Sequence, residues 1–339
     1  MKGLIVENTG NVKLVDDIPV PEINDYEALV KIECCMICNG TDMEIIHQQL
    51  REAKHYPLVL GHEGVGTVIK TGKKVRNFTI GDRVMRVSLA DSEKYYSGWG
   101  SFSEYGVVKD SGAMIEDGVD LTAAYGSLTQ QVVAPGITPE QASLMITLKE
   151  TCSALWRTGA CPGAELLIVG DGPVGLSMLS ICNYMGIKDV DIVGNHEESL
   201  KVAEKIGVRN RYHNKKDTDK EKLRSNRYDF YIDTIGTDET ILQGLSVIKE
   251  NGTIAVYGLR TGDNIVLPVN HIRNVTLKLV QWPIPAEEAK THQFVEEGIL
   301  SGKINTDILV THRLPLEDYE EGFRAIIGKK ALKVNLIIS

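Results

Sequence analysis

The stretch that most restricts the possible folds of this chain is an apolar run at residues 165–169, followed at once by Gly-Asp-Gly-Pro-Val-Gly at residues 170–175. The run predicts a buried strand, and a proline in this position suits the first turn of a helix. A G-x-G-x-x-G pattern between a strand and a helix is typical of a turn that binds the pyrophosphate of a dinucleotide. The sequence therefore predicts cofactor contacts from Gly170, Gly172, Pro173, Val174 and Gly175.

Strands and helices alternate around this turn. Apolar strands are predicted over residues 165–169, 190–193, 229–233 and 252–257. Helices are predicted near residues 173–186, 196–206 and 238–249. Alternation of helices with continuously apolar strands is typical of a doubly wound parallel sheet. We expect this dinucleotide-binding domain to span residues 141–284.

The chain before this domain has a different pattern, with short strand-like runs separated by glycine and proline. These runs predict strands over residues 4–7, 12–15, 27–35, 64–71 and 82–87. Residues 1–140 are therefore expected to form a β-rich domain. Beyond residue 285 a helix, a strand at 308–311, a second helix at 316–327 and a last strand at 332–338 are predicted.

The end of the second strand bears on the choice of dinucleotide. An NAD site usually has Asp or Glu at this strand end, where it accepts hydrogen bonds from the ribose hydroxyls. Here the position falls on Gly194, which leaves room for the 2′-phosphate of NADP, and Asn195 and His196 could donate to that phosphate. Glu197 and Glu198 argue mildly against a phosphate. We predict that NADP(H) is favoured over NAD(H).

A possible metal site lies in the β-rich part, where Cys38 precedes the stretch Val-Leu-Gly-His-Glu-Gly-Val-Gly at residues 59–66. The Cys38 thiolate, the His62 imidazole and the Glu63 carboxylate could form a zinc site with one coordination position open, which is the catalytic arrangement. The glycines would let the backbone run close to the metal. Alternatively, Cys38 could be buried core and His62 a core histidine satisfied by Glu63.

Taken together, these motifs resemble the zinc-dependent medium-chain dehydrogenase/reductase (alcohol dehydrogenase) family, nearest its sorbitol- and glucose-dehydrogenase-like polyol branch. The resemblance runs nearly end to end. It is carried by GHEGVGTVIKTGKKVRNFTIGDRV (61–84), GSFSEY (100–105), VGDGPVGL (169–176), IDTIGTDETI (232–241) and THRLPLEDYEEGF (311–323). It implies an α/β two-domain fold, in which a GroES-like β-barrel-type catalytic domain, to which residues 285–339 return, joins a Rossmann domain.

The resemblance also implies residue roles. Cys38 and His62 would be zinc ligands, and Glu63 a ligand in polyol-type members and a partner of a ligand in others. Zinc would act as a Lewis acid on the substrate oxygen while hydride passes to or from the nicotinamide. Thr41 would relay the proton, with His47 as a further carrier and Glu104 as a group that orients substrate hydroxyls. Thr234, Ile235 and Leu259 would line the nicotinamide side of the cleft.

Three departures from the family pattern are visible. Thr41 stands three residues after Cys38, whereas the family usually has its hydroxyl two residues after the cysteine. The position of a further ligand before the Rossmann domain falls on Met145 or Ile146, with Glu150 the nearest carboxylate. No cysteine lies between Asp82 and Gly100, so the lobe that binds a structural zinc is expected to be shortened, leaving one zinc per chain.

Composition limits the remaining possibilities. With 37 Lys and Arg against 46 Asp and Glu, the net charge is −9, which argues against nucleic acid or an anionic membrane as the main partner. We expect a cytoplasmic homodimer or homotetramer that acts on a small-molecule alcohol or sugar. Two alternatives stay open, an NADPH-dependent reductase of a small ketone or aldehyde and a non-catalytic NADP(H)-binding regulator with a degenerate zinc site.

Overall fold

The computed structural model describes residues 1–225, 227–258, 264–268 and 274–338. The chain divides into two compact units. Unit 1 comprises Met1–Thr147, Pro285–Leu300 and Val310–Ser339, and unit 2 comprises Leu148–Ile284 and Ser301–Leu309. Helix α4 (Pro139–Thr158) contributes residues to both units. The chain therefore returns twice to unit 1 after entering unit 2.

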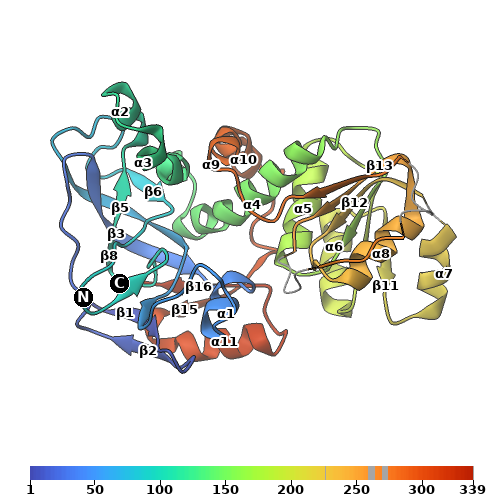
Figure 1. Cartoon of the computed structure of the whole chain (residues 1–339), viewed down its shortest axis with the longest axis horizontal. Helices are drawn as coiled ribbons and strands as arrows, with labels where there is room; N and C mark the ends of the chain where they lie inside the picture. Colours follow the sequence, from blue (N-terminus) through green and yellow to red (C-terminus); the bar gives the residue numbers. More distant parts are fainter. Residues whose placement is uncertain (226, 259–263, 269–273, 339) are drawn as a thin grey trace. The chain divides into compact units, whose positions relative to one another are not determined.

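Unit 1 is organised around β3 (Glu27–Met36), which has neighbours on both sides (Figure 1). Its first half alternates between buried and more exposed residues, while its last three residues are all buried. Alternate residues of a strand point to opposite faces, so this change means that both faces are covered where β3 ends. The sheet has the order β15-β16-β3-β5-β6, with β8 also paired to β3. The partners are β5 (Glu63–Thr71), β6 (Arg83–Met85), β8 (Tyr105–Lys109), β15 (Val310–Pro315) and β16 (Lys333–Ile337).

A second, four-stranded sheet completes the β structure of unit 1. Its order is β2-β1-β4-β7, formed by β1 (Gly3–Val6), β2 (Val12–Val15), β4 (Leu58–Val59) and β7 (Tyr96–Ser97). The short helices of this part are α1 (Thr41–Ile46), which lies between β3 and β4, and α2 (Ser111–Glu116), α3 (Leu121–Tyr125) and the 3₁₀ turn η1 (Gly126–Thr129), which follow β8. The returning segments add α9 (Pro285–Lys290), α10 (His292–Leu300), η3 (Leu316–Asp318) and α11 (Tyr319–Ile327).

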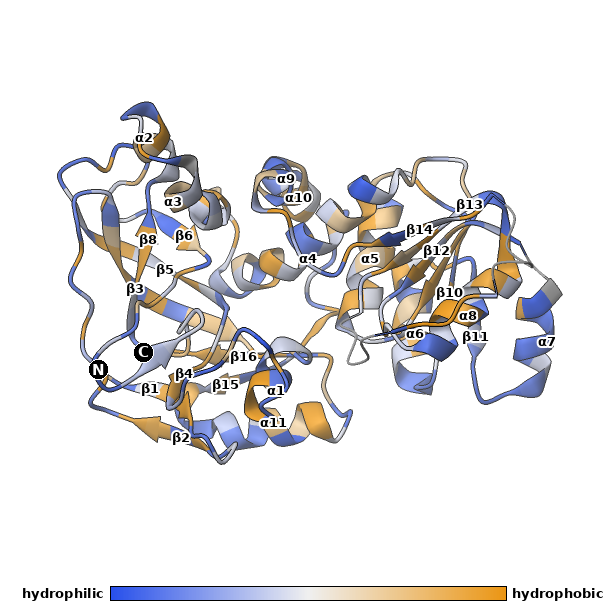
Figure 2. Ribbon diagram, viewed as in Figure 1, coloured by the Kyte–Doolittle hydropathy of each residue, from blue (hydrophilic) through white to orange (hydrophobic). Residues whose placement is uncertain are grey.

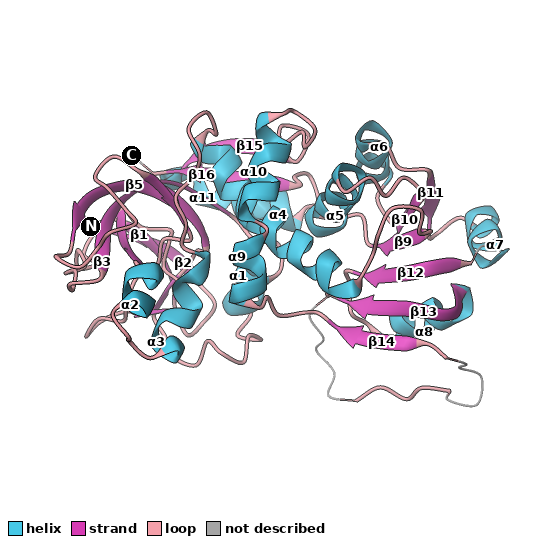
Figure 3. Cartoon of the chain, turned by 90° about the horizontal axis from the view of Figure 1, so that it is seen from above, coloured by secondary structure: helices cyan, strands magenta, loops and turns pink. Residues whose placement is uncertain are grey.

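Unit 2 contains a six-stranded, all-parallel sheet in the order β11-β10-β9-β12-β13-β14. Figure 3 shows the arrows of β12, β13 and β14 pointing the same way. The strands are β9 (Leu166–Val169), β10 (Val190–Gly194), β11 (Asn210–His213), β12 (Tyr228–Asp233), β13 (Ile248–Val256) and β14 (Thr276–Leu279). The predicted doubly wound parallel sheet is confirmed.

Helices cover the central strands of this sheet. All residues of β9 and β10 are buried, which requires apolar cover on both faces because successive side chains point in opposite directions. Figure 2 shows the central strands as predominantly hydrophobic. The covering helices are α5 (Pro173–Tyr184), α6 (Glu197–Ile206), α7 (Asp217–Ser225) and α8 (Asp238–Val247). Helices α5 and α6 contact β9, β10 and β11, and α8 contacts β12 and β13.

Throughout the part of the chain that the structure describes, no helix combines the length and the apolar character needed to cross a membrane.

Candidate functional site

Three strand ends meet in unit 1 at the place where the sequence predicts a metal site. In the sheet register, Met36 at the end of β3 lies opposite Glu63 at the start of β5 and opposite Asn335 near the start of β16. Cys38 follows Met36 by two residues, and Lys333 precedes Asn335 by two residues. The antiparallel pairing of both neighbours with β3 therefore brings Cys38, Glu63 and Lys333 to one edge of the sheet.

The structure brings together the three predicted metal-binding side chains. One donor atom from each of Cys38, His62 and Glu63 lies within 4.8 Å of the others. His62 is 6% exposed and Glu63 is 2% exposed, while Cys38 is partly exposed. Sulfur, imidazole nitrogen and carboxylate oxygen are all zinc ligands. A set with one accessible member suits an ion that must also receive a substrate.

Asp42, a fully buried residue of α1, connects two of these side chains. Its Oδ2 accepts a hydrogen bond from the Cys38 backbone N–H at 2.8 Å, and its Oδ1 lies 3.5 Å from His62 Nδ1. His62 Nε2 then faces the other side, 3.7 Å from Glu63 Oε1. A carboxylate behind a histidine is the usual support of a metal ligand, because it fixes the ring and its tautomer.

The electrostatics of this cluster favour a cation. Burial lowers the pKa of His62, but the Cys38 sulfur and the Asp42 carboxylate outweigh it and raise the pKa well above its usual value. Within the described part of the chain, neither His62 Nδ1 nor Asp42 Oδ1 has a hydrogen-bond partner, although both atoms are buried. Buried polar atoms usually have partners. A divalent ion on Nε2 would draw Nδ1–H toward Asp42, so these residues fit the group that the sequence predicts.

Besides its place in the metal cluster, Glu63 forms an ion pair with Lys333, which was not predicted from the sequence. Lys333 Nζ lies 2.6 Å from both Glu63 carboxylate oxygens, and neither side chain is more than 3% exposed. The Thr147 hydroxyl donates to Glu63 Oε1 at 3.2 Å. Ser143 accepts from the Met36 backbone N–H at 3.1 Å and donates to the Glu63 carbonyl at 2.6 Å, so it joins β3 to β5. Glu63 is thus both a potential ligand and half of a buried ion pair.

Little in the sequence could have identified these supporting residues. Asp42 lies four residues after Cys38, a spacing that suits a local bond to the cysteine backbone. Lys333 is 270 residues from Glu63, and only the register of β16 on β3 brings them together. Trp99 was also missed, and its ring centroid lies 5.3 Å from that of His62. The Trp99 ring therefore gives the candidate metal cluster an aromatic neighbour.

The other predicted residues of unit 1 lie at varying distances from the cluster. Thr41 begins α1, next to Asp42. His47 is an exposed residue at the opposite end of that helix. The Glu104 carboxylate accepts the Lys2 backbone N–H at 2.7 Å, and the Glu104 carbonyl accepts the Ile32 N–H at 2.9 Å. Its role toward the substrate stays a prediction.

The region of the predicted further ligand provides none. Met145 and Ile146 are buried apolar residues of α4. Glu150 is not part of the metal cluster found among the described residues, and its Oε2 lies 3.5 Å from the Tyr257 hydroxyl.

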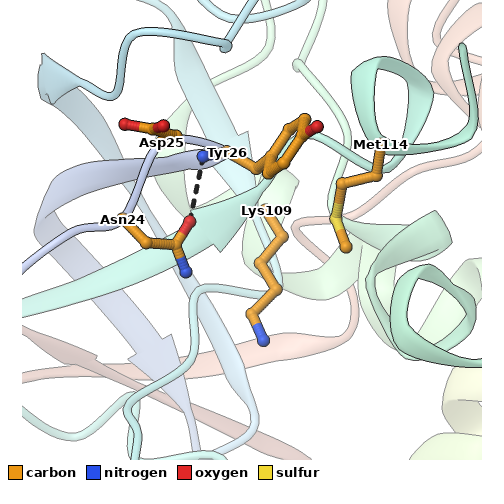
Figure 4. Close-up of a pocket in the computed structure, with 5 residues that line it drawn as sticks. All are labelled: Asn24, Asp25, Tyr26, Lys109 and Met114. Atoms are coloured by element: carbon orange, nitrogen blue, oxygen red, sulfur yellow. Dashed lines mark hydrogen bonds between the residues drawn. The ribbon is translucent and has the colours of Figure 1, made fainter. Parts of the chain in front are cut away.

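A pocket of about 410 Å³ opens at the other end of β3 (Figure 4). Its lining residues are Asn24, Asp25, Tyr26, Lys109 and Met114. Asn24 is already engaged, since its side-chain oxygen accepts the Tyr26 N–H at 2.9 Å. The pocket adjoins Glu27 at the start of β3, whereas Cys38 follows the end of this ten-residue strand. At about 3.3 Å per residue the two places are roughly 30 Å apart, so the pocket is separate from the metal cluster.

The predicted dinucleotide turn in unit 2 connects β9 to α5. Gly170 has φ +112°, and a Cβ there would lie 2.2 Å from Thr234 Oγ1. A Cβ on Gly175 would lie 2.0 Å from the Gly170 carbonyl oxygen. A Cβ on Gly172 would instead meet nothing within 4 Å. Gly170 and Gly175 are therefore required by packing. Gly172 leaves its backbone open to a ligand, as binding of a pyrophosphate requires. Pro173 and Val174 open α5.

The residues predicted to flank this turn lie close to it. Thr234 follows β12, the neighbour of β9, and its hydroxyl donates to the Val169 carbonyl at 2.7 Å. Ile235, which is 40% exposed, comes next. Gly194 ends β10, and Asn195 and His196 lead into α6. Leu259 lies outside the described residues.

The space beside Gly194 is occupied. A Cβ on Gly194 would lie 2.3 Å from Asp171 Cγ, so the Asp171 side chain rests against this glycine. The Cβ position of Gly194 is therefore not free, and the preference for NADP(H) over NAD(H) stays a prediction.

With this geometry established, comparison with known proteins is informative. Residues 24–116 match the family model described as the alcohol dehydrogenase GroES-like domain. Residues 173–297 match the model described as zinc-binding dehydrogenase. The first match includes the Cys38, His62 and Glu63 cluster, and the second begins within the glycine turn.

Individual relatives extend the similarity over nearly the whole chain. D-arabinitol dehydrogenase 1 of Uromyces fabae is 28% identical over 335 residues, covering 93% of this chain and 91% of the relative. Sorbitol dehydrogenase of Bombyx mori is 27% identical, covering 94% of each. Among solved structures, alcohol dehydrogenase TADH from Thermus sp. ATN1 matches with a TM-score of 0.83 and 20% identity, covering 100% of both chains. This last likeness concerns the fold.

Proposed function

Since this chain belongs to the medium-chain alcohol and polyol dehydrogenase family, we propose that it is a zinc-dependent dehydrogenase that transfers hydride between a nicotinamide cofactor and a secondary alcohol. The proposed substrate is a polyol, a sugar or a cyclitol. The observation that carries the proposal is the buried cluster of Cys38, His62 and Glu63 in a chain that also has a glycine turn after a parallel strand.

The residues of the cluster have distinct proposed roles. Cys38 and His62 hold the ion, and Asp42 keeps His62 oriented with Nε2 toward it. Glu63 contributes its carboxylate while Lys333 compensates its charge. Thr41, at the start of α1 beside Asp42, is the proposed proton relay. When bound, zinc would polarise the substrate oxygen and the nicotinamide would exchange the hydride.

Unit 2 has the task of binding and orienting the cofactor. The open backbone at Gly172 and the N-terminus of α5 offer N–H groups to the pyrophosphate. Thr234 and Ile235, which follow β12, are proposed to line the nicotinamide end. No residue of unit 2 is needed to hold the metal, so metal binding and dinucleotide binding can be measured separately.

Metal analysis of the purified protein tests this proposal. We expect about one zinc per chain, and we expect a chelator to remove the ion and the alcohol dehydrogenase activity together while dinucleotide binding survives. Added zinc should restore activity. A chain that binds dinucleotide but contains no zinc as purified, and takes none up, would contradict the proposal and support the non-catalytic regulator.

The substrate and the direction of reaction need a separate experiment. The curated relatives named above are dehydrogenases of arabinitol and sorbitol, which is why polyols come first. A screen of sugars, polyols, cyclitols and short secondary alcohols, run in both directions with NAD(H) and NADP(H), would identify the class. A strong preference for reducing small ketones or aldehydes would instead favour the reductase alternative.

Assembly into a homodimer or homotetramer is a further part of the proposal. Strand β14 is at the edge of the sheet, and Leu279 on it is 63% exposed. An edge strand that exposes apolar side chains tends to pair with another strand, and pairing of β14 with its own copy would give a closed two-fold interface.

The substitution Leu279→Glu is expected to shift the protein toward monomer, because two charges would face each other across that interface. Size-exclusion chromatography with light scattering would measure the change. Ile80→Glu, at a 69% exposed position of unit 1, is the matched control and should leave the mass unchanged. A monomeric parent protein, or a variant of unchanged mass, would show that β14 is not the interface.

A further inference from the structure

We propose that Asp171, the second residue of the glycine turn, binds the adenosine ribose hydroxyls and makes this protein selective for NAD(H) over NADP(H). The inference rests on the proposed function, because it assumes that the turn binds a nicotinamide dinucleotide. It assigns to a turn residue the role usually held by an acid at the end of the second strand. That usual position is Gly194 here.

The first support is where the Asp171 side chain lies. A Cβ on Gly194 would lie only 2.3 to 2.4 Å from Asp171 Cγ, Cβ and Oδ2. Since no side chain fits at Gly194, the two residues are complementary: the strand end has lost its side chain, and the turn supplies a carboxylate at the same place. A carboxylate between the glycines and the strand end is positioned to face the ribose next to the pyrophosphate.

The second support is how the carboxylate is held. Asp171 Oδ2 accepts the His196 backbone N–H at 2.6 Å, and Oδ1 lies 3.0 Å from His196 Nδ1. Asp171 is 5% exposed. A carboxylate has about four lone-pair sites, and these contacts use two of them. Both oxygens can therefore accept a further hydrogen bond from a sugar hydroxyl, without moving from a position that the His196 backbone already fixes.

The third support is the charge around this strand end. The 2′-phosphate of NADP would bring about −1.5 to −2 charges to a buried carboxylate, an unfavourable like-charge contact. Two of the nearby cations are already paired with acids. Arg211 lies 2.8 Å from Glu197 and also binds Glu204, and Lys216 lies 3.4 Å from Glu197. The His196 ring, predicted from sequence to donate to a phosphate, faces Asp171 instead.

Binding of nucleotide fragments tests the inference without requiring turnover. Calorimetric titration with ADP-ribose and with 2′-phospho-ADP-ribose compares two ligands that differ only in the phosphate. We expect the parent protein to bind ADP-ribose at least about tenfold more tightly. Asp171→Asn should weaken ADP-ribose binding by about 10- to 100-fold, the usual effect of losing a hydrogen bond to a charged group. It should weaken binding of 2′-phospho-ADP-ribose less, so that the preference for ADP-ribose becomes smaller or is reversed.

Two further variants sharpen this experiment. Glu221→Gln removes an exposed carboxylate of helix α7 and should leave both affinities unchanged. Asp171→Gly combined with Gly194→Asp removes the side chain that fills the space beside Gly194 and returns the acid to the strand end, and it should recover the preference for ADP-ribose. Recovery would support the inference, and the Asp171→Asn result decides the question by itself if the double variant does not fold.

The outcomes separate this inference from the proposed function. Tighter binding of 2′-phospho-ADP-ribose by the parent protein would overturn the role of Asp171, and so would equal weakening of both ligands in Asp171→Asn at unchanged thermal stability. In either case the protein would still be a nicotinamide-linked dehydrogenase. If the parent protein bound neither fragment, nor NADH or NADPH, the proposed function would fail together with the inference.

Discussion

Replacing Cys38 or His62 with alanine is expected to lower kcat by about 10³-fold or more while dinucleotide affinity stays within about twofold of the parent value. A metal that polarises a substrate oxygen supplies several kcal/mol of transition-state stabilisation, and each 1.4 kcal/mol is about tenfold in rate. Both residues belong to unit 1, whereas the glycine turn at residues 170–175 belongs to unit 2. Steady-state kinetics, zinc content and NADH titration together would measure the effect.

A matched control for the cysteine substitution is available. Cys161→Ala removes an exposed thiol of unit 2 and should change neither zinc content nor kcat. If Cys38→Ala kept its zinc but lost dinucleotide affinity, the assignment of the two tasks to different units would be wrong. If it kept both zinc and activity, the cluster would not be the catalytic centre.

The second large effect concerns the buried ion pair of Lys333 and Glu63. Lys333→Met is expected to lower the free energy of unfolding of unit 1 by about 3 to 5 kcal/mol, the usual cost of leaving one partner of a buried ion pair uncompensated. Lys333 touches both oxygens of Glu63, and neither residue is more than 3% exposed. Water therefore cannot replace the lost ammonium group. Urea denaturation of the zinc-free protein, in which no metal ion compensates Glu63, would measure the loss.

Tryptophan fluorescence can follow this unit alone. Of the three tryptophans, Trp156 and Trp282 belong to unit 2, so replacing them with phenylalanine leaves Trp99 as the reporter of unit 1. Lys330→Met, which removes an exposed lysine, should cost little. The double substitution Glu63→Gln and Lys333→Met should recover most of the stability, since neither charge of the pair remains. A loss below about 1 kcal/mol for Lys333→Met would show that the pair is not what stabilises this edge.

The fold was predictable where burial leaves a pattern in the sequence. The strands at 165–169, 190–193 and 229–233 were predicted because a centrally placed parallel strand is apolar on both faces. The edge strands β11 and β14 were missed. Each has a neighbouring strand on one side only, and each contains polar or charged residues, such as Arg211 in β11 and Lys278 in β14. Helix α7 was missed because Leu223 is the one buried side chain described in a charged segment.

The candidate site was predictable to the extent that its residues are chemically distinctive. Cysteine, histidine and glutamate near glycines suggest a metal, and the structure brings Cys38, His62 and Glu63 together. Lys333 could not be found, because strand register between distant segments is a property of the whole sheet. The Asp171 side chain beside Gly194 could not be predicted for a related reason: the sequence shows that a residue is small, but not which neighbour fills the space it leaves.

The division of unit 1 into three chain segments affects how the protein is made. Glu63 is synthesised 270 residues before Lys333, an interval of roughly 15 to 55 s at about 5 to 20 residues per second. Unit 2, which is almost continuous in the chain, is synthesised completely in the meantime. Until β16 follows, β3 lacks one of its neighbours and the Glu63 carboxylate has no counter-ion. The half of the molecule that is translated first is therefore the last to mature.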